Sequence, residues 1–134
     1  MLVPRKEDDR KIGLLVAEMS WLRRILGRSR KNRIRNEITM KELGQEITLI
    51  DKIRKRRLTW FGHVTRMEGS RLPAVALYGQ VEGTRSRGRQ SKKWMNNVKE
   101  DLPEQAMHVR EAVDNSRNRR IWRSLVEASS WATA

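Results

Sequence analysis

The chain has 134 residues, a formal net charge of +14 and no cysteine. This length usually corresponds to one domain, and 37% hydrophobic beside 34% charged residues predicts a thin core under a highly charged surface. The absence of cysteine excludes a disulfide framework and any thiolate metal site. No segment approaches the ~20 consecutive apolar residues that span a bilayer, and the N-terminus lacks the apolar run of a signal peptide.

Positive charge is concentrated in two stretches of the chain. Residues 23–36 contain seven Lys or Arg and no acid, whereas residues 52–99 contain thirteen, against only Glu68 and Glu82. A surface that serves only to keep the chain in solution intersperses both signs of charge. The segregation therefore predicts a polyanionic partner, and nucleic acid is the first candidate.

The N-terminal third predicts a tail followed by two helices. Residues 1–11 contain Pro4 and have no hydrophobic period, so we expect a disordered tail. Residues 12–26 repeat apolar side chains at the spacing of one helix face, and Gly27 supplies a C-terminal stop. After a basic connector over residues 28–35, Asn36 is the predicted N-cap of a short helix that ends at Gly44.

The stretch from Ile50 to Met67 predicts a long helix, starting near Ile47, around which the other elements are organised. At 100° per residue, its apolar side chains fall on one side and are expected to face a core. They are Ile50, Ile53, Trp60, Phe61, Val64 and Met67. The opposite side is expected to face anions and consists of Lys52, Lys55, Arg56, Thr59, His63 and Arg66.

Two residues of this helix interrupt its pattern. Gly62 lowers helix propensity by about 1 kcal/mol relative to Ala, which suggests that another helix approaches closely there. Arg57 falls within the apolar stripe, so we expect a partly buried guanidinium paired with an acid, with Asp101 the first choice and Asp114 the second. The alternatives are that the helix bends at Gly62 or that Arg57 extends outward along its aliphatic stem.

After Met67 the hydrophobic pattern weakens. Residues 72–78 form a brief apolar segment with Pro73 in a predicted first helical turn. Residues 79–90 have no apolar period and contain glycines among Arg85, Arg87 and Arg89. Such a segment cannot bury enough surface to offset its ordering entropy, so we expect a flexible basic loop that orders on a phosphate backbone. A plain linker is the alternative.

Three helices are predicted in the C-terminal part. Ser91 is the expected cap of a helix that Pro103 limits, and Lys92 and Lys93 extend the basic loop into it. Residues 104–113 predict a weaker amphipathic helix. Asn115 or Ser116 is the expected cap of the last helix, and residues 129–134 are expected to fray.

Four tryptophans fall one to a helix on predicted inner faces: Trp21, Trp60, Trp94 and Trp122. A tryptophan that binds a base would be expected among basic residues on an outer face. Packing in the core is therefore the favoured interpretation over base stacking. Trp131, outside any periodic segment, is expected to be exposed.

Several segments of the chain between Leu14 and Val126 resemble the C-terminal region of non-LTR (LINE-like) retrotransposon endonuclease/reverse transcriptase polyproteins. They are Trp21-Leu-Arg-Arg-Ile-Leu-Gly27, Arg33-Ile-Arg-Asn-Glu37, Arg57-Leu-Thr-Trp-Phe-Gly-His-Val-Thr-Arg-Met67, Gly88-Arg-Gln with Trp94, Glu100-Asp-Leu102 and Arg120-Ile-Trp-Arg123. The Trp-Phe-Gly-His segment is the most specific, and Gln90 stands where the family usually shows Pro. The resemblance implies a region downstream of the polymerase that helps to hold template RNA or target DNA.

Catalytic and metal-binding motifs are not found in the sequence. Polymerases of the family that this chain resembles carry an aromatic-X-Asp-Asp motif whose carboxylates hold two Mg²⁺, and no such motif occurs. His63 and His108 are far apart and lack the neighbours of a zinc site. There is also no nucleophile elbow, P-loop or dinucleotide loop. We expect no enzyme activity, cofactor or small-molecule substrate.

Together these patterns predict a mainly α fold with no sheet, formed by about five helices in one module over residues 12–128. The expected function is a non-catalytic nucleic-acid-binding accessory module that contacts RNA or DNA backbones. Its partners would be nucleic acid and the parent polymerase, without a membrane, in an intracellular and nuclear location. Two alternatives remain open: a protein-interaction module that uses the basic amphipathic helix, and a helix-turn-helix DNA-binding domain.

Overall fold

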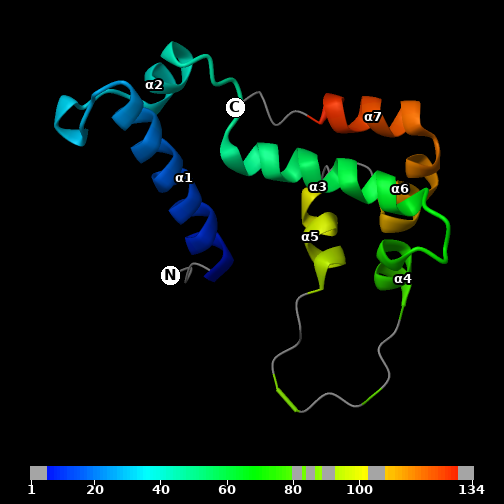
Figure 1. The fold of residues 1–134 in the computed structure, drawn as a ribbon. Helices are drawn as coiled ribbons and strands as arrows, with labels where there is room; N and C mark the ends of the chain where they lie inside the picture. The colour runs from blue at the N-terminus through cyan, green and yellow to red at the C-terminus, as the bar shows by residue number, and fades with distance from the viewer. Residues whose placement is uncertain (1–5, 80–82, 84–86, 89–92, 103–107, 130–134) are drawn as a thin grey trace. The chain divides into compact units, whose positions relative to one another are not determined.

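The computed structural model describes residues 6–79, 83, 87–88, 93–102 and 108–129 (Figure 1). These residues form seven α-helices and one 3-10 turn, and they contain no strand, which confirms the predicted mainly α fold for this part of the chain. The elements are α1 (Lys6–Ile25), η1 (Arg30–Asn32), α2 (Asn36–Glu42), α3 (Leu49–Thr65), α4 (Leu72–Tyr78), α5 (Trp94–Asp101), α6 (Val109–Arg117) and α7 (Arg119–Ala128).

The chain divides into two compact units instead of the single module that was expected. The boundary lies between Ile53 and Arg54, within α3, so that the first unit contains α1, α2 and the start of α3. The second contains the rest of α3 with α4 to α7. The distribution of the core explains the division: among the described residues, Met19 is the one buried apolar side chain of the first unit, and nine lie in the second.

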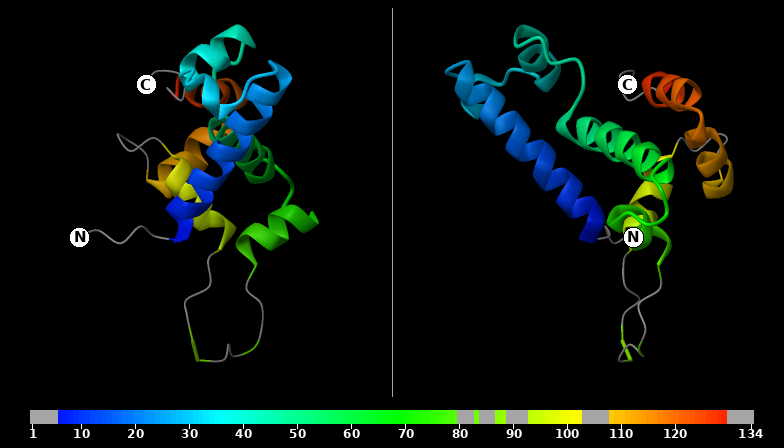
Figure 2. Two further views of the ribbon diagram at one scale, coloured as in Figure 1. Left: turned by 90° about the vertical axis from the view of Figure 1, so that its left-hand side faces the viewer. Right: turned by 45° about the vertical axis from the view of Figure 1, so that its right-hand side comes forward.

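In the first unit, α1 begins at Lys6, so residues 6–11, which were expected to belong to a disordered tail, are helical. Straight-chain charged residues have high helix propensity, and a helix can therefore extend beyond its apolar stripe. Helix α1 ends at Ile25, as the glycine at position 27, with φ +65°, requires. Helix α2 packs against α1 (Figures 1 and 2) and is followed by Gly44, with φ +63°.

The predicted cap of α2 is wrong by one residue. Arg35 occupies the N-cap position, while the side chain of Asn36 accepts a hydrogen bond from Arg23 Nη2 at 2.5 Å. Arg23 Nη2 also donates to the backbone oxygen of Ile34 at 3.4 Å. The amide of Asn36 thus joins α2 to α1 instead of satisfying the first amides of its own helix.

Helix α3 begins at Leu49, and two side chains determine that start. Thr48 Oγ1 accepts from the backbone N–H of Asp51 at 3.3 Å and donates to Asp51 Oδ2 at 2.6 Å, as an N-terminal capping residue does. Glu18, buried in α1, accepts from the backbone N–H of Leu49 through Oε1 at 2.9 Å. An acid on one helix therefore satisfies an amide at the first turn of another.

The core of the second unit forms where α7 packs on α3. Phe61 and Trp122 have ring centroids 5.6 Å apart, and Trp94 of α5 lies 6.4 Å from Phe61. The indole Nε1 of Trp122 donates to the carbonyl oxygen of Leu58 at 2.8 Å. A Cβ at Gly62 would overlap the indole of Trp122, so the close approach predicted at this glycine is confirmed.

The C-terminal helix boundaries differ from the predicted ones. Helix α6 covers Val109–Arg117 and ends beyond residue 113, where the expected helix over residues 104–113 ends. Positions 104–107 of that expected helix lie outside the described residues. The cap of α7 is Asn118, whose Oδ1 accepts from the amides of Arg120 and Ile121. Ser116, a predicted cap, is buried and bonds instead to Val113 O at 2.7 Å and to Thr65 Oγ at 2.7 Å.

Several sequence predictions fall on positions that the structure does not describe. Most of the basic loop over residues 79–90 lies outside the described residues, as do Ser91, Pro103 and Trp131. Helix α5 begins at Trp94 with Lys93 at its N-cap position.

Candidate nucleic-acid interface

The buried face of α3 is rotated from the predicted one. Leu58, Phe61, Gly62 and Val64 are buried, and their positions centre the core-facing side near Phe61 and Leu58. Trp60, which was expected to face the core, is 47% exposed. The rotation follows from Gly62, because the indole of Trp122 packs against the backbone there and draws that side of α3 into the core.

The side of α3 opposite this core carries the predicted basic surface. Lys55, Arg56, Thr59 and His63 of α3 are all exposed, as is Arg66, which directly follows the helix. We call these five residues the basic face of α3. Lys52, the sixth residue that was expected there, belongs to the first unit and is partly exposed. Its Nζ donates to Gln45 Oε1 at 2.6 Å.

Lys55 and Arg56 have no carboxylate within ion-pair distance among the described residues. Two other exposed cations of the second unit do have such partners. Arg117 lies 4.0 Å from Asp114, and Arg123 lies 3.5 Å from Glu127. The positive charge of Lys55 and Arg56 is therefore available to an external anion.

Arg66 is held by the neighbouring helix. Its Nη1 donates to the backbone oxygen of Ser116 at 2.6 Å, near the C-terminal end of α6, where a cation is favourable. Burial lowers the pKa of Arg66, and the nearby positive charge of Arg119 lowers it further, yet a guanidinium stays charged in proteins. The positive charge of Arg119 thus lies near that of Arg66.

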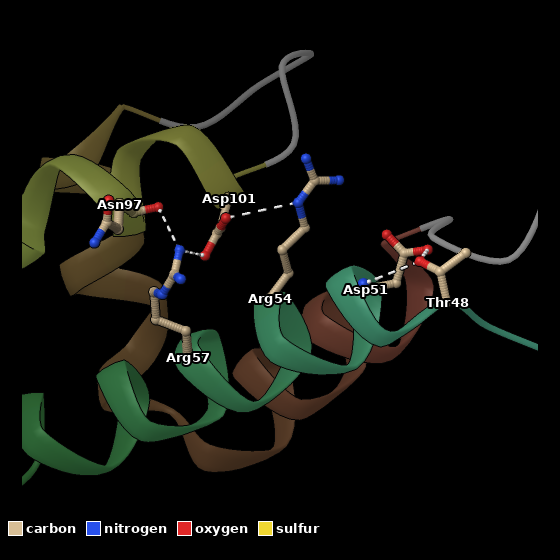
Figure 3. Close-up of polar contacts among 6 residues, drawn as sticks. All are labelled: Thr48, Asp51, Arg54, Arg57, Asn97 and Asp101. Atoms are coloured by element: carbon tan, nitrogen blue, oxygen red, sulfur yellow. Dashed lines mark hydrogen bonds and ion pairs between the residues drawn. The ribbon is translucent and has the colours of Figure 1, made fainter. Parts of the chain in front are cut away.

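The polar contact predicted for Arg57 is confirmed on another side of α3 (Figure 3). Arg57 Nη1 donates to Asp101 Oδ2 at 2.6 Å and to the backbone oxygen of Asn97 at 3.4 Å. Arg54 approaches the other carboxylate oxygen, with Nε 3.7 Å from Asp101 Oδ1. Burial raises the pKa of Asp101, while Arg57 and Arg54 act in the opposite direction. Arg57 and Arg54 therefore bind Asp101 of α5 and are not part of the basic face of α3.

Trp60 lies next to the basic face of α3 and was missed as a site residue. Its ring centroid is 5.3 Å from that of His63, with the planes tilted by 46°. The prediction of an inner position is correct for Trp122 and wrong for both Trp60 and Trp21, which is 57% exposed. Trp94 is 36% exposed, although its ring lies near Phe61. Trp21 lies about 200° around α1 from the buried Met19, since the two are two residues apart.

The remaining predicted site residues are not joined to α3 by any contact that the structure describes. Arg87 and Lys93 are exposed, and Lys93 precedes α5. Arg85, Arg89 and Lys92 lie outside the described residues. The predicted extension of the basic surface through the loop thus stays a prediction.

A cavity of about 1150 Å³ lies in the first unit, between α1, α2 and the start of α3. Its lining mixes both signs of charge and includes Glu18, Glu37 and Asp51 as well as Arg23 and Arg24. Such a mixture creates no single-sign potential. The basic face of α3 is therefore the better candidate for an anion-binding surface.

Within the described part of the chain, no group of three or more His, Asp or Glu is arranged to hold a metal ion. None of the helices described there is long and apolar enough to cross a membrane. Comparisons with protein-family models, with curated proteins and with solved structures find no match to this chain.

Proposed function

We propose that this chain is a non-catalytic nucleic-acid-binding accessory module, which contacts the phosphate backbone of RNA or DNA through the basic face of α3. The observation that carries the proposal is the unequal pairing of its cations. Lys55 and Arg56 project from a face opposite the core without a carboxylate partner among the described residues, whereas Arg117 and Arg123 are ion-paired. Unpaired Lys and Arg on one helix face supply the electrostatic contacts that phosphates require.

The charge distribution of α3 fits contact with nucleic-acid phosphates better than it fits base readout by a helix-turn-helix domain. A recognition helix places its N-terminal residues against base edges in the major groove. The first turn of α3 contains Asp51, whose carboxylate bonds to Thr48. An acid there would be repelled by DNA, and the exposed cations lie farther along the helix.

A protein-interaction module of the calmodulin-target type is the second candidate from the sequence. That mode inserts the apolar face of an amphipathic helix into a partner's groove. In α3 the apolar side is occupied, because Leu58, Phe61 and Val64 are buried in the second unit. Docking in that mode would require α3 to leave its own core.

The resemblance to the region downstream of a retrotransposon polymerase agrees with this proposal. A module that grips phosphates without catalytic residues would keep template RNA or target DNA near a separately folded polymerase. We propose the parent polymerase as a second partner, and a pull-down with such a polymerase core tests that association.

A salt-titrated binding series tests the main proposal. Affinity of the intact chain is measured against single-stranded RNA, structured RNA and duplex DNA from low to high salt. If about six cations engage phosphates, log K against log salt falls with a slope of roughly −5 for duplex DNA. Binding to calmodulin that survives salt, with no affinity for any nucleic acid, would overturn the proposal in favour of a protein-interaction module.

A further inference from the structure

We infer that Trp60, together with His63, forms a stacking site for an unpaired nucleobase, so that the preferred ligand is single-stranded or locally unpaired nucleic acid. The inference rests on the proposed function, because it adds a base contact to the phosphate contacts of the basic face of α3. It names a residue that the charge pattern alone does not include.

The first observation is the contrast between two adjacent aromatic residues. Phe61 is fully buried and contacts Trp122 and Trp94, which makes it a core residue. Trp60 is 47% exposed, and its one described ring contact is with His63. Trp60 is thus not one of the buried residues of the second unit, and about half of its surface remains open to an external group.

The second observation is the charge around Trp60. Arg56 lies one helical turn before it and His63 almost one turn after it on α3, so both neighbour Trp60 on the helix surface. Single-stranded nucleic-acid sites combine cations that follow the backbone with aromatic side chains on which bases stack. In a duplex the bases are already stacked on one another, so such a platform selects strands whose bases are free.

One nucleotide can contact both the aromatic surface of Trp60 and the positive charge beside it. A base stacked on Trp60 would leave its phosphates near Arg56, whose charge has no described carboxylate partner. A hydrophobic protein partner would also cover an exposed tryptophan. The surrounding positive charge favours an anionic ligand with a flat apolar part, which is the chemistry of a nucleotide.

The test compares Trp60→Phe, Trp60→Leu and Trp60→Ala in the full chain. Binding is measured to single-stranded poly(U) RNA, to oligo(dT) DNA and to a duplex DNA of equal length. Stacking predicts that Trp60→Ala lowers single-strand affinity by between about 5-fold and about 150-fold, that Trp60→Phe retains most of it, and that Trp60→Leu resembles Ala. Duplex affinity and the salt slope stay unchanged, since no charge is removed. Comparing poly(U) with oligo(dT) distinguishes RNA from DNA as the source of the base.

Two controls separate this inference from the proposed function. Tyr78→Ala removes another exposed aromatic side chain, on a helix without basic residues, and is expected to leave all affinities unchanged. Lys55→Ala with Arg56→Ala lowers single-strand and duplex affinity alike if the proposed function holds. If that pair has its effect but Trp60→Ala weakens single-strand and duplex binding equally or not at all, the stacking site is overturned alone. Equal binding by Trp60→Leu and wild type would likewise contradict stacking.

Discussion

Gly62 shows how a single residue determines which side of α3 is buried. In a helix interior, replacing Gly by Ala normally stabilises by about 1 kcal/mol. At Gly62 a Cβ would overlap the indole of Trp122, so we expect Gly62→Ala to lower the unfolding free energy, by about 1 to 3 kcal/mol as overpacked cores do. Gly62→Leu should be more severe. Chemical denaturation measures both variants.

Gly13 provides the matched control for this prediction. It lies within α1, and a Cβ there would meet nothing within 4 Å. Gly13→Ala is therefore expected to stabilise α1 through helix propensity alone. If Gly62→Ala were as favourable as Gly13→Ala, close packing of Trp122 on α3 would be contradicted.

Asp101 joins α5 to α3 through Arg57. Removing one partner of a buried ion pair typically costs about 3 to 5 kcal/mol, but Arg57 is partly exposed and keeps a bond to Asn97, so about 1 to 3 kcal/mol is expected for Asp101→Ala. Asp101→Asn should cost less, because an amide oxygen still accepts from Arg57. Equal losses for both variants in urea unfolding would rule out this hydrogen bond as the important contact.

The raised pKa of Asp101 gives this contact a pH dependence with a definite sign. The folded protein holds the proton more tightly than the unfolded chain, whose pKa is about 3.9, since burial disfavours the carboxylate. The contribution of Asp101 to stability therefore falls as the pH rises from about 4 through the folded pKa. The unfolding free energy of wild type minus that of Asp101→Asn should therefore be larger near pH 4 than near pH 7, as urea unfolding at the two pH values measures.

At the scale of a helix, caps were predicted less well than periodicity. Asn118 was overlooked because Asn115 and Ser116 precede the same apolar run and offer equally good capping groups. The structure selects Asn118 because Ser116 is buried against Thr65, a contact between residues far apart in the sequence. A local sequence pattern contains no information about such a partner.

Asn118→Ala tests the observed cap. The substitution removes the acceptor for the amides of Arg120 and Ile121. We therefore expect the unfolding free energy, measured by chemical denaturation, to fall by about 1 kcal/mol. Asn118→Asp, which keeps an acceptor oxygen, should be close to neutral. Asn115→Ala examines the rejected alternative, and a larger loss there than at Asn118 would contradict the assigned helix boundary.

The face of α3 shows the limit of helical periodicity. Five of the six residues on the predicted basic side are exposed, since cations rarely enter a core without partners, and their role in binding stays a prediction. The boundary of the apolar side was predicted wrongly, because Trp60 lies near the edge of the predicted stripe, where a small rotation of the helix decides whether it is covered. That rotation is set by Trp122, which is distant in sequence but packs on Gly62. The pairing of Arg57 with Asp101 was predictable because a buried charge requires a nearby acid.

At the scale of the whole chain, composition predicted a thin core and hydrophobic periodicity predicted a mainly α fold, but neither predicted how unevenly the core is distributed. The apolar residues of α1 repeat as regularly as those of the later helices, yet Ile12, Trp21 and Ile25 are exposed. Periodicity shows that a helix has an apolar face but does not show whether another element covers it. The two compact units could therefore not be predicted from the pattern.

The uneven core predicts different local stabilities. Backbone amides of α1 and α2 should exchange with solvent faster than those of α7 and of the part of α3 after Ile53. The reason is that few buried apolar side chains oppose local opening of the first unit. Native-state hydrogen exchange measures this directly. Uniform protection along all these helices would show that the chain opens as one cooperative unit.

The central claim is that Lys55 and Arg56 bind phosphates because their charges have no carboxylate partner among the described residues, whereas Arg117 and Arg123 are paired with acids. The most direct measurement compares two double variants that lose the same charge: Lys55→Ala with Arg56→Ala, and Arg117→Ala with Arg123→Ala. For duplex DNA, the first should make the slope of log K against log salt less negative by about 2, and the second should change it by much less. Equal changes in slope would mean that net charge alone drives binding and would contradict a binding face on α3.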